Sequence, residues 1–565
     1  METVMKNNRT YLLLAAFAAA LLPVMILRDF TPSNELRYLS IADEALRDGH
    51  LFAFFNHGVP YADKPPLYLW LVMLGRQLFG GHCMAFLSLF SLVPAMVILR
   101  TMDRWAAESG VTVRNRTTAA LMLMTSGLFL GLAVFVRMDM LMCMFITLAL
   151  RSFWLLYTGR GNAKLHRWLF PLFTWLALFT KGPVGLLVPL LSVAVFLILN
   201  GQGRLTGRYC GWFTWGVIAA GCAVWFTLAW LEGGTDYLNN LLFHQTFDRA
   251  VDAFHHKEPV WYYFVTVWYS LAPWSLLVIG GIVVALCRRV RLDESERFFL
   301  TVILTTWVML SLFSSKLAVY LAPTFPFLVY LAASLLQRMP AAAWWQKGAV
   351  ALPAVVWAAA LPTVLLLRHR VESVVPDGVV WLLAAGALTC SGMAALVLLC
   401  RDDSLHRAVG SVAAGVLITV FTLGFSLPEL NVRLGYGTLC REAKQLLQAN
   451  GWSNYYVWNI RRAESMDVYL GRPVEETSVE ELCAGRCDDG VVMLPGRKLQ
   501  SDARLRNFVS DRRCHEVGEY LIVELPPAMP ADSRQAWRGS PHAAGRCGAP
   551  ICRSGRPRGS CRCAA

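Results

Sequence analysis

The run YLLLAAFAAALLPVMIL (residues 11–27) contains no charged residue and is almost wholly apolar. An uninterrupted apolar stretch of about this length is typical of a helix that crosses a bilayer. Lys6 and Arg9 precede the run, as basic residues precede a signal sequence. Because no convincing small-residue cleavage site follows, we expect the run to be retained as a first membrane span.

Apolar runs of this kind recur along most of the chain. Of the 565 residues, 56% are hydrophobic and 16% are charged, against about 45–50% and about 25% in ordinary soluble proteins. This composition excludes a soluble globular protein and predicts an α-helical polytopic membrane protein with about 13 spans. The predicted spans are 11–27, 81–99, 117–135, 138–150, 168–179, 184–199, 211–231, 261–286, 298–314, 317–336, 348–367, 378–400 and 408–427.

The distribution of basic residues predicts the orientation of these spans. With a cytoplasmic N-terminus, the inner segments hold 20 Lys and Arg residues in 84 positions, and the outer segments hold 12 in 104. This bias follows the positive-inside rule, so we expect the C-terminal region to lie outside. The net charge of +14 is spread over short loops and the tail, and we expect no nucleic-acid partner.

Three domains are predicted from polarity and periodicity. Residues 1–427 form a transmembrane domain with long outer loops at 28–80 and 232–260, and residues 428–525 form a small outer α/β domain. Its strands are expected near Tyr455, Val491 and Tyr520, with helices at 438–449 and 461–470. The basic tail, residues 526–565, is expected to be disordered. Four cysteines in these regions could form disulfides if the α/β domain lies outside: Cys440, Cys483, Cys487 and Cys514.

The first outer loop contains a predicted amphipathic helix at 35–47. Leu36, Leu39 and Leu46 recur at helical spacing, and charged residues occupy the opposite face. Ser33 or Asn34 is expected to cap its N-terminus.

Charged residues from five separate places in the chain fall near the outer membrane surface under this topology. Taken singly, each of these residues is equally well explained as a charge that marks the membrane interface or, for the lysines, as a snorkelling side chain. Their coincidence on one side favours a functional site. They are Glu35, Lys64, Asp139, Lys181 and Lys316.

The second outer loop adds cations and histidines beside an aromatic segment. Arg249, His255 and His256 precede Trp261 and its neighbouring tyrosines. Cations beside aromatics suit a phosphate at headgroup depth, because Arg pairs with its oxygens while rings hold an attached lipid or sugar. A simple interfacial belt is the alternative.

An ordered series of short motifs resembles the bacterial branch of the C-type glycosyltransferases, in particular the lipid A aminoarabinose transferases and protein mannosyltransferase-related enzymes. Each motif alone is weak, but their order over about residues 10–340 is specific. They are NELRY (34–38), YADKPP (61–66), RMD (137–139), TKG (180–182), PVWYY (259–263) and SK (315–316).

The resemblance implies an inverting transferase that moves a sugar from a polyprenyl-phosphate carrier to an acceptor, with lipid A favoured, on the periplasmic side of a bacterial inner membrane. The sugar would be 4-amino-4-deoxy-arabinose or another pentose or hexose. By this analogy Glu35 and Asp139 are catalytic carboxylates. The residues expected to bind the donor phosphate are Arg37, Tyr61, Lys64, Lys181, Arg249, Lys316 and Tyr320.

The chain departs from the family pattern at two acids. Many relatives have Asp-Glu where this chain has Asn34 and Glu35, which is why Glu35 is the expected base. Relatives also have Glu where Asp63 stands, and some hold a metal there. Asp63 with His255 or His256 could bind Zn or Mg, although the ligand set is short.

A transporter or flippase of polyprenyl-linked sugars is the main alternative. It would also place basic and aromatic residues around a lipid phosphate, but it should need polar groups along a path through the bilayer. The ionisable residues here gather on one side, which favours the enzyme.

Overall fold

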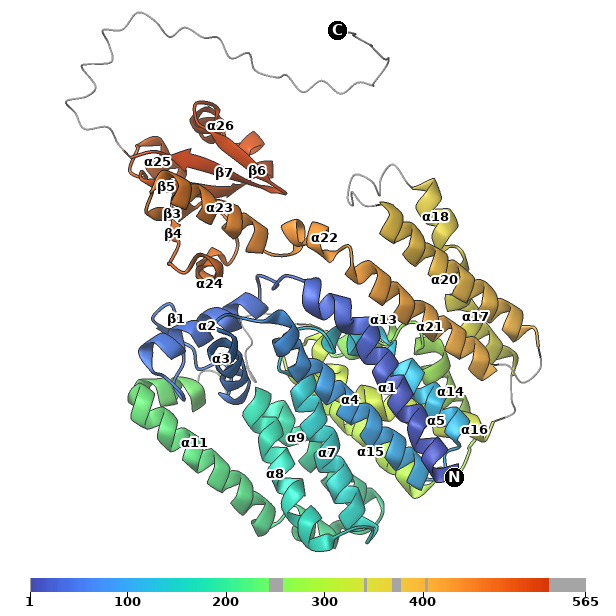
Figure 1. Ribbon diagram of the computed structural model, residues 1–565. Coiled ribbons are helices and arrows are strands. Elements are labelled where there is room, and N and C mark those ends of the chain that lie inside the picture. The colour runs from blue at the N-terminus through green and yellow to red at the C-terminus, as the bar shows by residue number, and fades with distance from the viewer. Residues whose placement is uncertain (1, 243–257, 340–342, 368–377, 402–404, 528–565) are drawn as a thin grey trace, which may run out of the picture.

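The computed structural model describes residues 2–242, 258–339, 343–367, 378–401 and 405–527, and it is a helical bundle with a small sheet domain at one end (Figure 1). Nine helical segments in this part of the chain are long and apolar enough to cross a membrane. Three shorter apolar helices accompany them: α3 (Leu67–Phe79), α9 (Pro183–Leu199) and α14 (Ser275–Cys287).

Each of the thirteen predicted runs corresponds to a helix or to a pair of successive helices. The runs without a break lie in α1 (Glu2–Leu27), α4 (Met84–Glu108), α7 (Asp139–Tyr157), α8 (Ala163–Lys181), α9, α11 (Trp212–Asn239), α15 (Glu294–Leu312), α20 (Gly378–Leu399) and α21 (Leu405–Gly424). The kink of α11 at Gly234 lies beyond the predicted run 211–231. The divided ones are α5 (Val113–Met124) with α6 (Gly127–Leu132), α13 (Tyr262–Ser270) with α14, η3 (Ala318–Thr324) with α16 (Phe325–Gln337), and α17 (Trp344–Ala358) with α18 (Ala360–Leu366).

Two of these divisions meet inside the bundle. The Gly127 amide, at the start of α6, donates to the Ala272 carbonyl between α13 and α14 at 2.9 Å. The Trp274 indole donates to the Thr125 hydroxyl, just after α5, at 2.8 Å. Backbone groups freed within an apolar environment need partners inside the protein. The two breaks therefore satisfy part of each other's hydrogen bonding.

Aromatic side chains from four helices form the centre of the bundle. Trp105 of α4 is fully buried and its ring lies within about 6 Å of the rings of Trp154, Phe298, Phe299 and Phe327. These residues belong to α7, α15 and α16. Edge-to-face and tilted pairs of this kind add to the burial of apolar area.

The first outer loop folds into α2 (Glu35–Asp48), a short hairpin of β1 (Phe55–Asn56) and β2 (Val59–Pro60), and α3. The predicted amphipathic helix is thus present, with Leu36, Leu39 and Ala42 buried. The predicted capping by Asn34 is wrong. Asn34 stands at the N-cap but makes no side-chain cap hydrogen bond, because its amide oxygen accepts from Arg37 instead, at 3.4 Å.

The C-terminal part is an α/β unit with a five-stranded sheet in the order β4-β3-β5-β7-β6. β3 is parallel to β4 and β5, whereas β7 is antiparallel to β5 and β6. The three expected strands are β3 (Asn454–Val457), β5 (Gly490–Pro495) and β7 (Tyr520–Leu525); β4 (Glu475–Glu476) and β6 (Cys514–Val517) were not predicted. The helices include α22 (Leu427–Leu434), α23 (Gly437–Asn450), η4 (Ala463–Met466), α24 (Asp467–Leu470), α25 (Val479–Cys483) and α26 (Ala503–Ser510).

The four cysteines considered for disulfides are all unpaired in the described structure. Cys440 is buried beneath the sheet, whereas Cys483 and Cys514 are exposed at other elements. Nearly all of the tail predicted to be disordered, residues 528–565, lies outside the described residues.

Direct hydrogen bonds join the sheet domain to the end of the bundle formed by α1 and α2. The Asp29 carboxylate, just after α1, accepts from the Gly437 amide at 2.8 Å and from the Tyr469 hydroxyl. The Ser40 hydroxyl of α2 donates to Asp467 at 2.9 Å. In Figure 1, α24 accordingly faces α2. The sheet domain therefore lies on the same end of the molecule as the first outer loop.

Candidate functional site

A buried carboxylate at the start of α7 holds two cations. Asp139 is 1% exposed, accepts from the Arg137 Nε at 2.9 Å and forms an ion pair with Lys181. Lys181 is the last residue of α8, and its ammonium lies 4.6 Å from the centre of the Tyr320 ring. The structure therefore brings together three predicted site residues, Asp139, Lys181 and Tyr320, and adds Arg137.

The first outer loop supplies a second group of polar side chains. The Arg37 guanidinium lies 5.6 Å from the centre of the Tyr61 ring. The Tyr61 hydroxyl donates to Asp63 at 3.3 Å, and the Lys64 ammonium lies 3.3 Å from the same carboxylate. Burial raises the pKa of Tyr61 well above its ordinary value, so its hydroxyl stays protonated as a hydrogen-bond donor. Four predicted residues, Arg37, Tyr61, Asp63 and Lys64, are thus gathered here.

Tyr38 joins these two groups. Its buried ring lies 5.7 Å from the Arg37 guanidinium. Its hydroxyl interacts electrostatically with Arg37 and Asp63 of one group and with Arg137 and Asp139 of the other. The cations and carboxylates around Tyr38 therefore form one region, which we call the polar cluster: Arg37, Tyr38, Tyr61, Asp63, Lys64, Arg137, Asp139, Lys181 and Tyr320.

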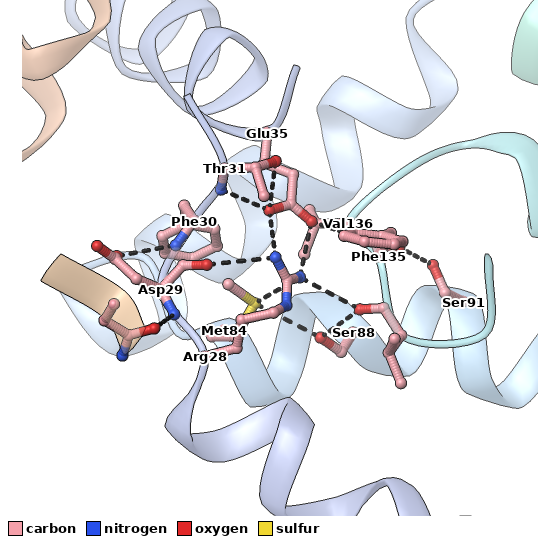
Figure 2. A network of polar contacts seen from close by, with 12 residues as sticks. Arg28, Asp29, Phe30, Thr31, Glu35, Met84, Ser88, Ser91, Phe135 and Val136 are labelled. Carbon is pink, nitrogen blue, oxygen red and sulfur yellow. Dashed lines mark hydrogen bonds and ion pairs between the residues drawn. The ribbon is translucent and has the colours of Figure 1, made fainter. Parts of the chain in front are cut away.

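Glu35 lies beside the polar cluster with both carboxylate oxygens occupied. Figure 2 shows its bidentate ion pair with Arg28, in which both N···O distances are 2.7 Å. Glu35 also accepts from the Thr31 amide and hydroxyl, at 2.7 and 2.9 Å, and from the Val136 amide at 2.7 Å. The carboxylate is 1% exposed. These donors already occupy the lone pairs of the carboxylate, which leaves none for the hydroxyl of an acceptor.

The Arg28–Glu35 pair instead fixes the segment that leads to Asp139. Arg28 donates to the Val134 carbonyl at 3.4 Å, and Ser88 donates to the same carbonyl at 3.2 Å. Ser91 donates to the Phe135 carbonyl at 2.6 Å. With the Val136 amide held by Glu35, three successive residues before Arg137 are tied to α1, α2 and α4 (Figure 2).

Lys316 stands apart from these carboxylates. Its buried ammonium donates to the carbonyls of Phe313 and Glu258, at 2.6 and 2.9 Å. Arg249, His255 and His256 lie outside the described residues, so their predicted roles stay predictions. No group of three or more His, Cys, Asp or Glu side chains suited to a metal occurs within the described ranges.

The sequence interpretation missed Arg28, Tyr38 and Arg137 as members of this site. Arg28 directly follows the first apolar run and was indistinguishable from an interfacial charge. Tyr38 lies one helical position after Arg37 in a quoted motif, but nothing in the sequence showed that its ring connects two loops. Arg137 stood in the RMD motif, where only the acid drew attention.

Part of the chain matches a known protein family and several curated proteins. Residues 8–235 match the family model of dolichyl-phosphate-mannose-protein mannosyltransferases. An undecaprenyl phosphate-alpha-4-amino-4-deoxy-L-arabinose arabinosyl transferase of Edwardsiella ictaluri is 28% identical over 315 residues, which are 54% of this chain and 55% of that protein. A Pseudomonas fluorescens protein of the same description is 26% identical over 330 residues, 55% of this chain and 54% of that protein. The matched part thus spans about half the length of these curated relatives.

Solved structures share the fold. ArnT from Cupriavidus metallidurans bound to undecaprenyl phosphate superimposes with a TM-score of 0.70, at 17% identity, over 92% of this chain and 97% of that one. The same protein in its apo state gives a TM-score of 0.68 at 18% identity, over 92% and 98%. The resemblance predicted from the ordered motifs is confirmed. The fold class, a polytopic helical membrane protein of the C-type glycosyltransferase fold with a small C-terminal sheet domain, is confirmed as well.

Proposed function

We propose that this chain is a glycosyltransferase that moves a sugar from a polyprenyl-phosphate carrier to a lipid acceptor. The sugar is 4-amino-4-deoxy-arabinose or a related pentose or hexose, and lipid A is the favoured acceptor. The observation that supports the proposal most strongly is the polar cluster, in which buried cations and carboxylates gather at one end of an ArnT-like fold.

The cations of the polar cluster would bind the donor phosphate. Arg37 lies beside the Tyr61 ring, Lys64 beside the Asp63 carboxylate and Lys181 beside the Tyr320 ring. A phosphate that leaves the sugar has a low proton affinity, so charge stabilises its departure more effectively than an acid would. Each of these cations is within reach of a carboxylate or aromatic ring in the free protein, which keeps it positioned before the donor binds.

Asp139 is the carboxylate that we assign to the acceptor hydroxyl. It orients this hydroxyl and takes its proton as the oxygen attacks the anomeric carbon, while the bond to the carrier phosphate breaks. A single displacement of this kind inverts the anomeric configuration. When the donor phosphate draws Lys181 away from Asp139, the carboxylate becomes a stronger proton acceptor. Glu35, also predicted to be catalytic, is here assigned to positioning because all its lone pairs are occupied.

No step in this mechanism runs through a metal. Asp63, the one predicted metal ligand within the described ranges, already accepts from Tyr61 and pairs with Lys64. A cation at this carboxylate repels a divalent ion, so Asp63 with these partners does not fit a ligand of Zn or Mg.

The proposed orientation puts the polar cluster and the sheet domain on the periplasmic side of a bacterial inner membrane, with the N-terminus in the cytoplasm. The basic short loops support this direction. The domain division at 427 and 428 is part of the same proposal, and the start of α22 at Leu427 supports it.

Transfer by the purified protein tests the proposal. The full chain is incubated with radiolabelled polyprenyl-phosphate sugars and lipid A, and Asp139→Asn is compared with wild type. We expect the variant to lose about 10²-fold or more of the rate, as removal of a general base does. Asp103→Asn is the matched control, because Asp103 also pairs with an arginine within the bundle, at 3.1 Å, but lies outside the polar cluster. Wild-type transfer by Asp139→Asn would refute the residue assignment.

If the protein transfers no sugar from any polyprenyl-linked donor, the proposed glycosyltransferase activity is refuted. The same preparation, reconstituted in vesicles with a fluorescent donor, distinguishes the alternative. Movement of the donor between leaflets without transfer would identify a flippase.

A further inference from the structure

The sheet domain meets the bundle at the end of α1, directly beside Arg28. The Asp29 carboxylate accepts from the Gly437 amide at 2.8 Å and from the Tyr469 hydroxyl. It also accepts from the amide of the next residue, Phe30, at 2.8 Å. Gly437 begins α23 and Tyr469 belongs to α24. Two helices of the sheet domain therefore hold one carboxylate of the first outer loop.

Asn431 of α22 fixes the backbone on both sides of Arg28. Its side-chain Nδ2 donates to the Leu27 carbonyl at 2.7 Å, and its Oδ1 accepts from the Asp29 amide at 2.9 Å. Leu27 is the last residue of α1, where a carbonyl has no partner within the helix. A single amide side chain thus holds the two peptide groups that flank Arg28.

The close approach of Asp29 to the sheet domain needs two glycines. A Cβ atom at Gly435 would lie 2.3 Å from the Asp29 Oδ2, and a Cβ atom at Gly437 would lie 2.6 Å from it. Gly435 has an extended backbone that any residue can adopt, so the requirement is one of space. Because both distances are far below van der Waals contact, a larger residue at either position would push the carboxylate away.

Apolar packing joins the same two parts of the molecule. Leu36 and Leu39 of α2 and Leu439 and Ile522 of the sheet domain belong to one cluster of buried apolar side chains. Burial of this kind supplies most of the free energy that holds two elements together, whereas the net contribution of one hydrogen bond is small. The loss of a single hydrogen bond between the two parts should therefore leave the sheet domain docked.

Arg28 connects the sheet domain to the segment before Asp139. Figure 2 shows its hydrogen bond to the Asp29 carbonyl, at 3.2 Å, beside its ion pair with Glu35. The Glu35 carboxylate in turn accepts from the Val136 amide at 2.7 Å. Direct contacts therefore connect the sheet domain with the backbone three residues before Asp139.

We propose that the sheet domain takes part in catalysis by positioning Arg28. Asn431 and Asp29 fix the backbone around Arg28. The pair of Arg28 and Glu35 then holds the segment that leads to Asp139, so that this carboxylate faces the acceptor hydroxyl. Asn431 and Asp29 are positioning residues, because they act through Arg28 and Glu35. This inference rests on the proposed sugar transfer and gives the C-terminal domain a part in it.

Hydrogen exchange of the full chain in detergent tests the structural connection without a substrate. Asn431→Ala removes both hydrogen bonds around Arg28, so exchange of the Val136 amide should become about ten-fold faster as the segment opens more easily. Asn450→Ala is the matched control, because Asn450 also donates to a main-chain carbonyl, at 2.9 Å, but does so within α23. It should leave the exchange of Val136 unchanged. Equal exchange of Val136 in the wild type and in Asn431→Ala would overturn the proposal.

Single-turnover transfer measures the catalytic consequence. At saturating donor and acceptor, Asn431→Ala should lower the rate about ten-fold, because Asp139 is displaced from the acceptor hydroxyl. The donor concentration at half saturation should change by less than about two-fold, since the shared apolar cluster still holds α2 with Arg37. An unchanged rate, or a loss that appears only as weaker donor binding, would overturn the proposal. Absence of transfer by the wild type would instead refute the proposed function.

Tyr469→Phe keeps the proposal testable if Asn431→Ala does not fold. It removes one hydrogen bond to the Asp29 carboxylate and retains the aromatic ring. The transfer rate should fall about three-fold, the effect of one hydrogen bond of ordinary strength. Tyr456→Phe is the matched control, because the Tyr456 hydroxyl donates to the Asp488 carbonyl at 3.4 Å inside the sheet domain. Equal rates in Tyr469→Phe and Tyr456→Phe would overturn the proposal.

Discussion

Glu35 and Asp139 are both buried carboxylates beside an arginine, yet their remaining partners differ. Glu35 accepts backbone amides from two segments, and a backbone amide cannot move away when a substrate binds. Among the described residues, the Asp139 carboxylate is paired with the side chains of Arg137 and Lys181, which can turn toward a phosphate. The sequence motifs predicted both acids as catalytic. A sequence shows the types and order of residues, but it does not show which hydrogen-bond partners of a carboxylate can move away.

Replacing Glu35 by Gln should lower both stability and transfer. The change leaves the buried Arg28 guanidinium without its counter-charge, which costs about 3 kcal/mol in comparable buried pairs. We expect a lower apparent melting temperature and at least a ten-fold slower transfer at a temperature where the variant is folded. Asp48→Asn is the control on the same helix, because Asp48 pairs with Arg47 at the surface and should not change either quantity.

The pH dependence of the residual activity distinguishes positioning from proton transfer in Glu35→Gln. If Glu35 only positions Asp139, the shape of the pH profile is that of the wild type. Loss of the acidic limb in this variant, with its retention in Asp139→Asn, would make Glu35 the base and contradict our assignment.

His57 links the first outer loop to the sheet domain in a pH-dependent way. Its Nε2 lies 3.1 Å from Asp467, and the hydrogen bond to this carboxylate, aided by the charges of Asp467, Glu44 and Glu464, raises the pKa of His57 above its ordinary value. A histidine whose pKa is raised by folding contributes stability below its ordinary pKa and loses it as pH rises through the raised value. The contact should therefore weaken as the pH rises above the ordinary histidine pKa of about 6.5.

Hydrogen exchange of α24 measures this contact. We expect exchange at residues 467–470, corrected for the intrinsic pH dependence, to rise with pH in the wild type and to be independent of pH in His57→Gln. His515→Gln is the matched control, because His515 pairs with Glu524 inside the sheet at 2.8 Å. An unchanged pH dependence in His57→Gln would show that another group controls the contact.

At the scale of helices and strands, the apolar runs predicted the positions of the helices better than their continuity. The runs 117–135 and 261–286 were predicted as single spans because no charged residue interrupts them. Pro273 has no amide hydrogen to continue a helix. The Ala272 carbonyl, between α13 and α14, accepts from the Gly127 amide, 145 residues earlier in the chain. Strands β4 and β6 were missed because two to four mostly exposed residues carry no alternation.

The start of α15 should depend on its capping box. The Asp293 carboxylate accepts from the Glu296 amide at 2.8 Å, and the Glu296 carboxylate accepts from the Asp293 amide at 2.9 Å. Asp293→Ala should lower the free energy of unfolding by about 1 kcal/mol, the usual value of an N-cap. Asp293→Asn retains a capping oxygen and should come close to wild type. Thermal unfolding in one detergent compares the three proteins, and equal losses for Ala and Asn would attribute the effect to charge rather than to the cap.

At the scale of the whole molecule, the sequence predicted which loops share a membrane face but not how their side chains meet. The alternation of spans sufficed to bring Lys64, Asp139 and Lys181 to one end. It could not show that Lys316 donates to two carbonyls instead, because that depends on the path of the backbone between α15 and η3.

Native cysteines on both ends of the molecule test the proposed orientation. Cys483 and Cys514 are exposed on the sheet domain, and Cys287 and Cys400 are exposed at the ends of α14 and α20. In right-side-out spheroplasts, a membrane-impermeant maleimide should label Cys483 and Cys514 but not Cys287 or Cys400, and permeabilisation should add the latter two. Peptide mass spectrometry identifies each site. Labelling of Cys287 and Cys400 before permeabilisation would invert the topology.

The meeting of the two helix breaks has a consequence for biosynthesis. When α5 and α6 leave the ribosome, the groups that complete Gly127 and Thr125 are still more than a hundred residues from being made. Until the segment around Trp274 is synthesised and inserts beside α5 and α6, the translocation machinery must keep the polar groups at the break between these helices away from lipid. The order of insertion is thus constrained by two hydrogen bonds, and a truncation before residue 272 should leave a chain that quality-control proteases recognise in the membrane.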